Sequence, residues 1–136
     1  MPVIVDTCVF SLALRRRQRD LHPGEKKLRS KLTQLVAEGL ATLLGPVRQE
    51  LLSGICDASQ FQELRQRLRA LPHPALEAAD YEQAAEASNA CRAAGLAGGS
   101  VDFLICGVSL HRDWPIFTTD QDFERYRRIL TLRLFS

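Results

Sequence analysis

The stretch Val3-Ile4-Val5-Asp6-Thr7 opens the sequence with a β-branched apolar run that ends directly in an aspartate. Such a run predicts a buried strand of a parallel sheet, because strands covered on both faces are apolar throughout. Further outward, the apolar runs 41–44, 114–118 and 129–135 predict three more strands. Strands that alternate with helical segments indicate an α/β fold with a mainly parallel sheet covered on both faces.

The segments between these runs carry helix signals. Asp80 with Gln83 is expected to cap one helix and Ser100 another, and the small residues within 84–91 allow close packing. We expect helices over residues 28–39, from 45 onward, over 57–71, 80–91, 101–108 and 120–128.

Length and composition place the chain among folded intracellular proteins. With 136 residues, 46% of them hydrophobic, it is long enough for one domain with its own core and too apolar to be disordered. No apolar run is long enough to cross a membrane, and the first residues lack the features of a signal peptide, so we expect a soluble, cytoplasmic protein. Because the four cysteines form no CxxC pair, we expect reduced thiols rather than a zinc site.

Most of the basic residues are arginine, which accounts for 15 of the 18, although the net charge of the chain is only +2. Arginine binds phosphate in bidentate fashion, so the bias permits nucleic-acid contact. A GC-rich genome gives the same bias, and this interpretation stays open. The stretch Arg15–Arg19 and the arginines at 65, 67 and 69 are the candidate phosphate contacts, or else a solvated face.

Two acidic residues stand in places where solvated charges are not expected. Asp6 directly follows the first strand, at the end of a parallel sheet where sites form, although it is also a suitable N-cap for a helix from Thr7. Glu50 lies three residues after Val47 and four before Gly54, which predicts a position on the core-facing side of its helix. A buried ion pair with an arginine is the alternative role for Glu50.

Three further acids lie at helix starts. Asp102 falls in the first turn of an apolar helix, where the helix dipole alone also favours an anion. Asp120 and Asp122 follow the strand that ends at Thr118, and one of them is also a candidate N-cap for the next helix.

In a parallel sheet, acids at positions 6, 50, 102 and 120 can converge on one edge. Two unit charges 4 Å apart repel by about 4 kcal/mol at an effective dielectric constant near 20, so such a cluster must take up protons or bind cations. Carboxylate oxygens are suitable ligands for Mg²⁺ or Mn²⁺. A metal in such a site activates water and neutralises the charge that develops on a phosphodiester.

Four acidic motifs occur in the order found in a known family. The chain resembles a PIN-domain ribonuclease, and its size suggests the VapC toxin type of type II toxin–antitoxin systems. The motifs are Val-Ile-Val-Asp-Thr at 3–7, Arg-Gln-Glu-Leu-Leu-Ser-Gly at 48–54, Ser-Val-Asp-Phe-Leu-Ile-Cys at 100–106 and Phe-Thr-Thr-Asp-Gln-Asp-Phe at 117–123.

The resemblance implies a three-layer α/β/α sandwich that spans residues 1–136 as a single domain. It implies a Mg²⁺- or Mn²⁺-dependent endoribonuclease that acts on RNA, forms a homodimer and is blocked by a cognate antitoxin. Thr7 and Thr118 match hydroxyl residues that orient the acids or the substrate phosphate, and Asp122 matches a less uniform metal-binding position. The residues that match the catalytic, metal-binding acids of the family are Asp6, Glu50, Asp102 and Asp120.

Two other functions remain open at the level of sequence. A strand followed by Asp-Thr is also found in phosphotransferases with an aspartate nucleophile, but these need a second acid two residues on, where this chain has Cys8. The other alternative is a non-catalytic module that binds RNA or protein and uses its acids only as structural caps.

Overall fold

The computed structural model describes residues 1–14 and 20–136 and contains a parallel sheet of three short strands in the order β2-β1-β3. The central strand β1 aligns Val3 with Ala41 on one side and Ile4 with Ile116 on the other. All strand residues are buried, as the apolar runs predict. The strands are β1 (Val3–Val5), β2 (Ala41–Thr42) and β3 (Ile116–Phe117).

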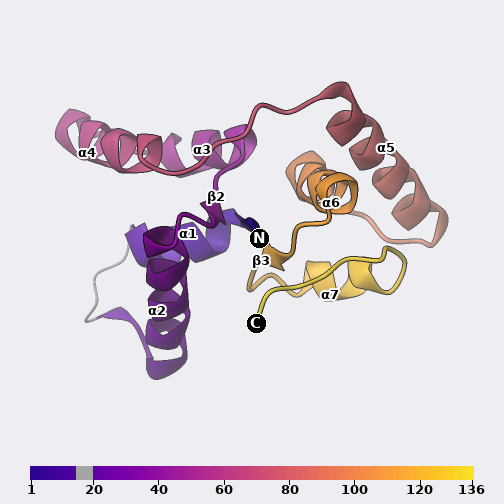
Figure 1. Ribbon diagram of the computed structural model, residues 1–136, viewed down its shortest axis with the longest axis horizontal. Coiled ribbons are helices and arrows are strands. Elements are labelled where there is room, and N and C mark those ends of the chain that lie inside the picture. Colours follow the sequence, from indigo (N-terminus) through magenta and orange to yellow (C-terminus); the bar gives the residue numbers. More distant parts are fainter. Residues whose placement is uncertain (15–19) are drawn as a thin grey trace.

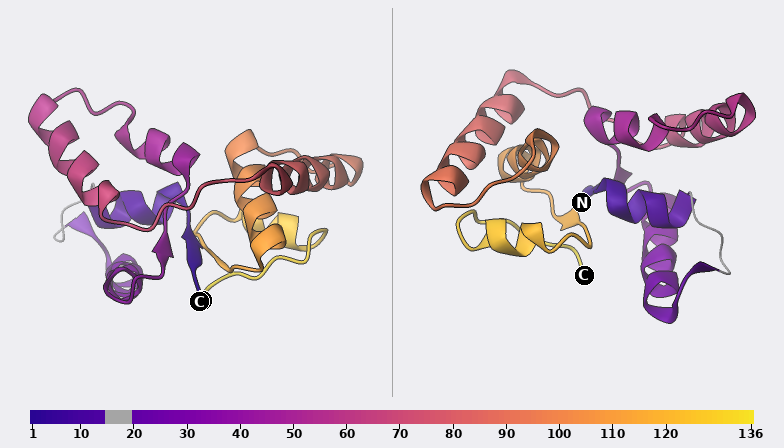
Figure 2. Two further views of the ribbon diagram at one scale, coloured as in Figure 1. Left: turned by 45° about the horizontal axis from the view of Figure 1, so that its top comes forward. Right: turned by 180° about the vertical axis from the view of Figure 1, so that it is seen from behind.

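Helices cover the sheet in two groups, one on each side (Figure 1, Figure 2). The first group contains α1 (Thr7–Leu14), α2 (Pro23–Ala37), α3 (Gly45–Leu52) and α4 (Ala58–Arg69). The second contains α5 (Ala78–Ala93), α6 (Ser100–Arg112) and α7 (Asp122–Arg127). The result is the expected α/β/α arrangement. None of the helices in the described part of the chain has the length and hydrophobicity needed to cross a membrane.

One hydrophobic cluster takes residues from all of these strands and helices. The closest helix pair in it is α5 with α6, where Gly107 of α6 faces the backbone of Ala84. A Cβ atom at position 107 would lie 2.5 Å from the Ala84 nitrogen, so only glycine allows this approach. The small residues of α5 therefore permit the close packing that the sequence predicts. The four cysteines are free, and Cys91 and Cys106 are buried in the core.

Several expected elements have different bounds in the structure. The run 129–135 was expected to form a closing strand, but it pairs only through a single bridge between Leu134 and Ile116. The strand prediction for this segment is wrong because its apolar residues pack on the core without a continuous ladder. The last helix begins at Asp122 rather than Asp120.

The two predicted N-caps are also wrong. Helix α5 starts at Ala78 and has Glu77 as its N-cap. Asp80 lies inside the first turn as the capping-box partner of Glu77. Helix α6 has Gly99 at its N-cap, so Ser100 is the first helical residue and makes no side-chain cap. In both cases the residue type that suits a cap lies inside the helix.

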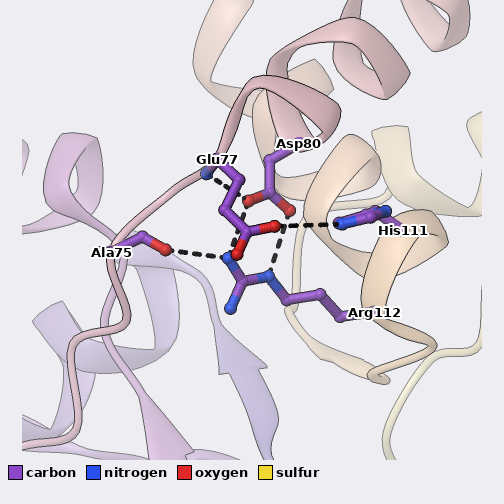
Figure 3. Close-up of polar contacts among 5 residues, drawn as sticks. All are labelled: Ala75, Glu77, Asp80, His111 and Arg112. Atoms are coloured by element: carbon purple, nitrogen blue, oxygen red, sulfur yellow. Dashed lines mark hydrogen bonds and ion pairs between the residues drawn. The ribbon is translucent and has the colours of Figure 1, made fainter.

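Asp80 lies inside the first turn of α5 because it makes a long-range ion pair (Figure 3). Its carboxylate is fully buried and accepts hydrogen bonds from Nε of Arg112 at 3.1 Å and from Nη2 at 2.7 Å. Arg112 also donates to the Ala75 carbonyl at 2.9 Å and stacks on Trp114 at 5.1 Å. The hydrogen bond from Arg112 holds the pKa of Asp80 below its ordinary value. The pair thus ties the start of α5 to the end of α6.

We predict that Asp80→Asn lowers the free energy of unfolding by about 2–4 kcal/mol, because Arg112 loses its charge partner inside the protein. Urea unfolding at pH 7 measures the change. Glu86→Gln is the matched control, since Glu86 lies on the same helix and is exposed, and its effect should stay within about 0.5 kcal/mol. Equal losses in the two variants would contradict a stabilising role for the ion pair.

Candidate metal centre

Three carboxylates meet beside the end of strand β3. Asp102 lies in the first turn of α6, Asp120 follows β3, and Asp122 is the first residue of α7. Each offers one ligand atom, and these atoms all lie within 4.8 Å of one another. Helix α6 leads back into β3, so its start lies at the edge where the parallel strands end. The site is therefore at the sheet edge that the sequence predicts.

Asp6 is linked to this group through a threonine. Its carboxylate is buried, with 7% of the residue exposed, and Oδ1 accepts the backbone N–H of Thr7 at 2.8 Å. Oδ2 accepts the hydroxyl of Thr118 at 2.8 Å, and the Thr118 oxygen accepts the backbone N–H of Asp120 at 3.0 Å. Asp120 Oδ1 in turn accepts the N–H of Asp122 at 2.9 Å. These bonds join the ends of β1 and β3 into one polar network.

The negative charges of the group act on one another. The pKa of Asp102 is raised to about 6, first by burial and then by the charges of Asp6, Asp120 and Asp122. A hydrogen bond from the Tyr126 hydroxyl to Asp102 Oδ2, 3.1 Å long, opposes this increase. The same surroundings, burial first, raise the pKa of Tyr126 well above its ordinary value.

Little positive charge compensates these carboxylates. Asp122 pairs with Arg125 at 2.9 Å, and both side chains are partly exposed. Asp102 and Asp120 make no ion pair with any residue that the structure describes. Oxygen ligands that converge with so little counter-charge have the chemistry of a site for a hard divalent cation such as Mg²⁺ or Mn²⁺. The residues present therefore fit such an ion.

In a comparison with models of protein families, the one that describes the PIN domain matches residues 3–129 of this chain. The chain belongs to the PIN-domain family. This confirms the family that the four acidic motifs indicate. A comparison with curated protein sequences found no match.

Solved structures with the same fold align along nearly the whole PIN domain. VapBC2 from Rickettsia felis, bound to a DNA fragment from its promoter, gives a TM-score of 0.75 at 20% identity and covers 99% of this chain and 98% of that one. FitAcB from Neisseria gonorrhoeae gives a TM-score of 0.72 at 16% identity, and the alignment covers 98% of this chain and 96% of that one. DNA-bound VapBC from Salmonella typhimurium gives a TM-score of 0.75 at 14% identity, and the alignment covers 99% of this chain and 97% of that one.

Glu50 does not lie where its spacing predicts. Helix α3 of the PIN domain turns Val47 and Leu51 toward the core, and Glu50 is exposed to solvent. The prediction that Glu50 faces the core is wrong because Val47 and Leu51, four residues apart, occupy the buried side of this short helix. Glu50 lies beside that buried side, where it contacts solvent. Glu50 is also absent from the group formed by Asp102, Asp120 and Asp122.

The two threonines take different parts in the network. Thr118 bridges Asp6 and Asp120 through its hydroxyl, whereas Thr7 contributes its backbone N–H. The Thr7 hydroxyl oxygen is buried and has no hydrogen-bond partner among the described residues.

The basic stretch Arg15–Arg19 lies outside the residues that the structure describes. On α4, Arg65 stacks on the ring of Phe61 at 5.7 Å.

Sequence reasoning missed two neighbours of the carboxylates. The thiol of Cys8 lies 3.5 Å from Asp6 Oδ2 and accepts the Thr119 hydroxyl at 3.2 Å. Tyr126 donates to Asp102 from inside the core. Cys8 follows Asp6 by two residues, so its proximity was readable from the sequence. Tyr126 gave no such signal, because its position in a short amphipathic helix is equally suitable for an aromatic that only packs.

We predict that Asp102→Asn stabilises the metal-free protein at neutral pH. Because the folded-state pKa of Asp102 is raised, ionisation weakens the wild-type fold progressively from about pH 4 through pH 6. Asparagine removes this charge and still accepts the Tyr126 hydrogen bond. The gain in the free energy of unfolding should be close to zero at pH 4 and reach about 1–2 kcal/mol at pH 7.5, with solvent screening included.

Urea unfolding in the presence of a chelator, at several pH values, measures the difference between Asp102→Asn and the wild type. A difference that is constant from pH 4 to pH 7.5 would show that Asp102 ionises as freely in the folded protein as in the unfolded chain.

Proposed function

We propose that this PIN domain is a Mg²⁺- or Mn²⁺-dependent endoribonuclease and the toxin of a VapC-type toxin–antitoxin pair. The observation that carries the proposal is the convergence of Asp102, Asp120 and Asp122, with ligand atoms within 4.8 Å and without a matching set of cations. A module that only bound RNA would gain nothing from such a group, since uncompensated carboxylates repel phosphate.

The chain supplies the ligands and their orientation. We assign Asp102, Asp120 and Asp122 as ligands from their proximity, and Asp6 as a fourth acid that Thr118 holds toward Asp120. When bound, a divalent ion supplies an activated water and neutralises the charge on the scissile phosphodiester. No nucleophilic serine, cysteine or histidine is required.

The partners of this function are proposals from the neighbouring folds and the family. VapBC and FitAcB structures share the fold along nearly the full length of the chain, which supports a cognate antitoxin as a protein partner. RNA as the substrate and a homodimer as the assembly follow from the family resemblance. We also propose that residues 1–136 act as one domain, which the single hydrophobic cluster supports.

We predict that Asp102→Asn and Asp120→Asn each reduce metal-dependent cleavage of single-stranded RNA at least about 100-fold while the protein stays folded, because each removes a charged ligand. Cleavage with Mg²⁺ or Mn²⁺ is measured on a labelled RNA, and circular dichroism checks the fold. Asp57→Asn, on the exposed N-cap of α4, is the control for loss of an aspartate elsewhere. Wild-type protein that binds RNA but cleaves none with either ion would favour the non-catalytic binding module.

Glu50 is proposed as a further ligand on the family resemblance alone. If the exposed side chain joins the metal, Glu50→Gln should lower cleavage about 10- to 100-fold and weaken Mn²⁺ binding. Glu63→Gln on α4 is the matched control, since Glu63 is also an exposed glutamate on a helix of the same layer. Cleavage rates that are equal in the two variants would remove Glu50 from the site and leave the four aspartates.

A further inference from the structure

Tyr126 is a buried aromatic residue with one polar contact. Only 1% of the residue is exposed, and its ring packs between Phe103 at 5.1 Å and Phe123 at 5.4 Å. Its hydroxyl is the donor to Asp102 Oδ2, at 3.1 Å. The two phenylalanines thus fix the ring, and the fixed ring aims the hydroxyl at one carboxylate of the acidic group.

The turn between α5 and α6 closes over this hydroxyl. A Cβ atom on Gly98 would overlap the Tyr126 hydroxyl oxygen and lie 2.9 Å from Cζ of the ring. Gly98 is not among the glycines with positive φ, so its backbone conformation is open to alanine. The absence of a side chain at position 98 is therefore explained by the space that the Tyr126 hydroxyl occupies, together with the ring of Tyr126 and the ring of Phe103, whose Cε2 would lie 3.0 Å away.

Beside it, Gly99 has open space. A Cβ atom there would meet nothing within 4 Å, and its φ of −80° is suitable for any residue. The two neighbouring glycines differ in their surroundings: a Cβ atom on Gly98 would meet the Tyr126 hydroxyl and the rings of Tyr126 and Phe103, whereas one on Gly99 would not. They form a matched pair for mutation.

We propose that Tyr126 is a positioning residue of the metal centre: its hydroxyl fixes the orientation of the Asp102 carboxylate, and Gly98 keeps the hydroxyl in place. This inference rests on the proposed metal-dependent function. Asp102 lies in the first turn of α6, with one side exposed, and the Tyr126 hydroxyl is the donor that limits rotation of its carboxylate. Hydrogen bonds that orient metal ligands are commonly worth 10- to 100-fold in metal affinity.

The first test compares the Mn²⁺ dissociation constants of wild type, Tyr126→Phe and Tyr81→Phe, from the electron paramagnetic resonance signal of free Mn²⁺. Phenylalanine keeps the ring packing and removes only the hydroxyl, and Tyr81 is 54% exposed and serves as the control. We expect binding by Tyr126→Phe to be about 10-fold weaker and binding by Tyr81→Phe to be unchanged. The measurement is made well below the unfolding midpoint of each variant, so that loss of fold does not contribute.

A Tyr126→Phe affinity within twofold of the wild type would overturn the positioning role and leave the metal-dependent function intact. A wild-type protein that binds no Mn²⁺ and cleaves no RNA would overturn both. The two failures are therefore distinguishable in one experiment.

The second test places alanine at each of the paired glycines. Gly98→Ala should displace the hydroxyl and weaken Mn²⁺ binding about as much as Tyr126→Phe, whereas Gly99→Ala should leave the affinity within twofold of the wild type. In the Tyr126→Phe background, Gly98→Ala should cause a smaller further loss of affinity than in the wild type, because the hydroxyl that it displaces is gone and only its contacts with the two aromatic rings remain. Independent, additive losses from Gly98→Ala and Tyr126→Phe would overturn the role of Gly98.

Discussion

The electrostatic repulsion among carboxylates at the carboxyl edge of the sheet is the constraint on which the other features of the site depend. Parallel strands end at the same edge, so residues that follow β1 and β3 meet there whatever their separation along the chain. Burial raises the pKa of Asp102 most, and the repulsion from Asp6, Asp120 and Asp122 raises it further. A divalent cation would offset this repulsion, and the carboxylate oxygens present are suitable ligands for one.

The surroundings of the carboxylates fix their positions instead of neutralising them. Thr118 bridges two chain segments through one hydroxyl, and Tyr126 reaches Asp102 from the core. Neutral donors of this kind orient an acid without cancelling its charge, whereas an arginine in the same place would compete with a metal ion. Arg125 pairs with Asp122 at the exposed rim of the group, where solvent weakens its effect.

The remote parts of the fold also serve the site, because they determine where α6 lies. Gly107 allows α5 and α6 to approach until their backbones are in contact. The buried pair of Asp80 and Arg112 ties the far end of α6 to the start of α5. With the middle and the C-terminal end of α6 held in this way, its first turn presents Asp102 beside Asp120. Asp102 and Asp120 are 18 residues apart in sequence, and packing contacts at Gly107 and Arg112, about 7 and about 15 Å along the helix from Asp102, help to place them side by side.

Short-range patterns in the sequence were enough to predict the elements and the places of several acids. The apolar run 3–5 predicted a buried strand, and the alternation of elements predicted the parallel sheet. Asp6 follows a strand and Asp102 lies at a helix start as expected, whereas Asp120 lies between β3 and α7. Contacts between residues that are far apart in the sequence became visible only in the folded chain. Asp80 meets an arginine that is 32 residues away, residues 129–135 find room for a single bridge, and Tyr126 finds a carboxylate rather than a purely apolar neighbour. Periodicity specifies which side of a helix or strand is apolar. The long-range partner of a residue depends on how separate helices and strands pack together, and no local pattern in the sequence predicts that packing.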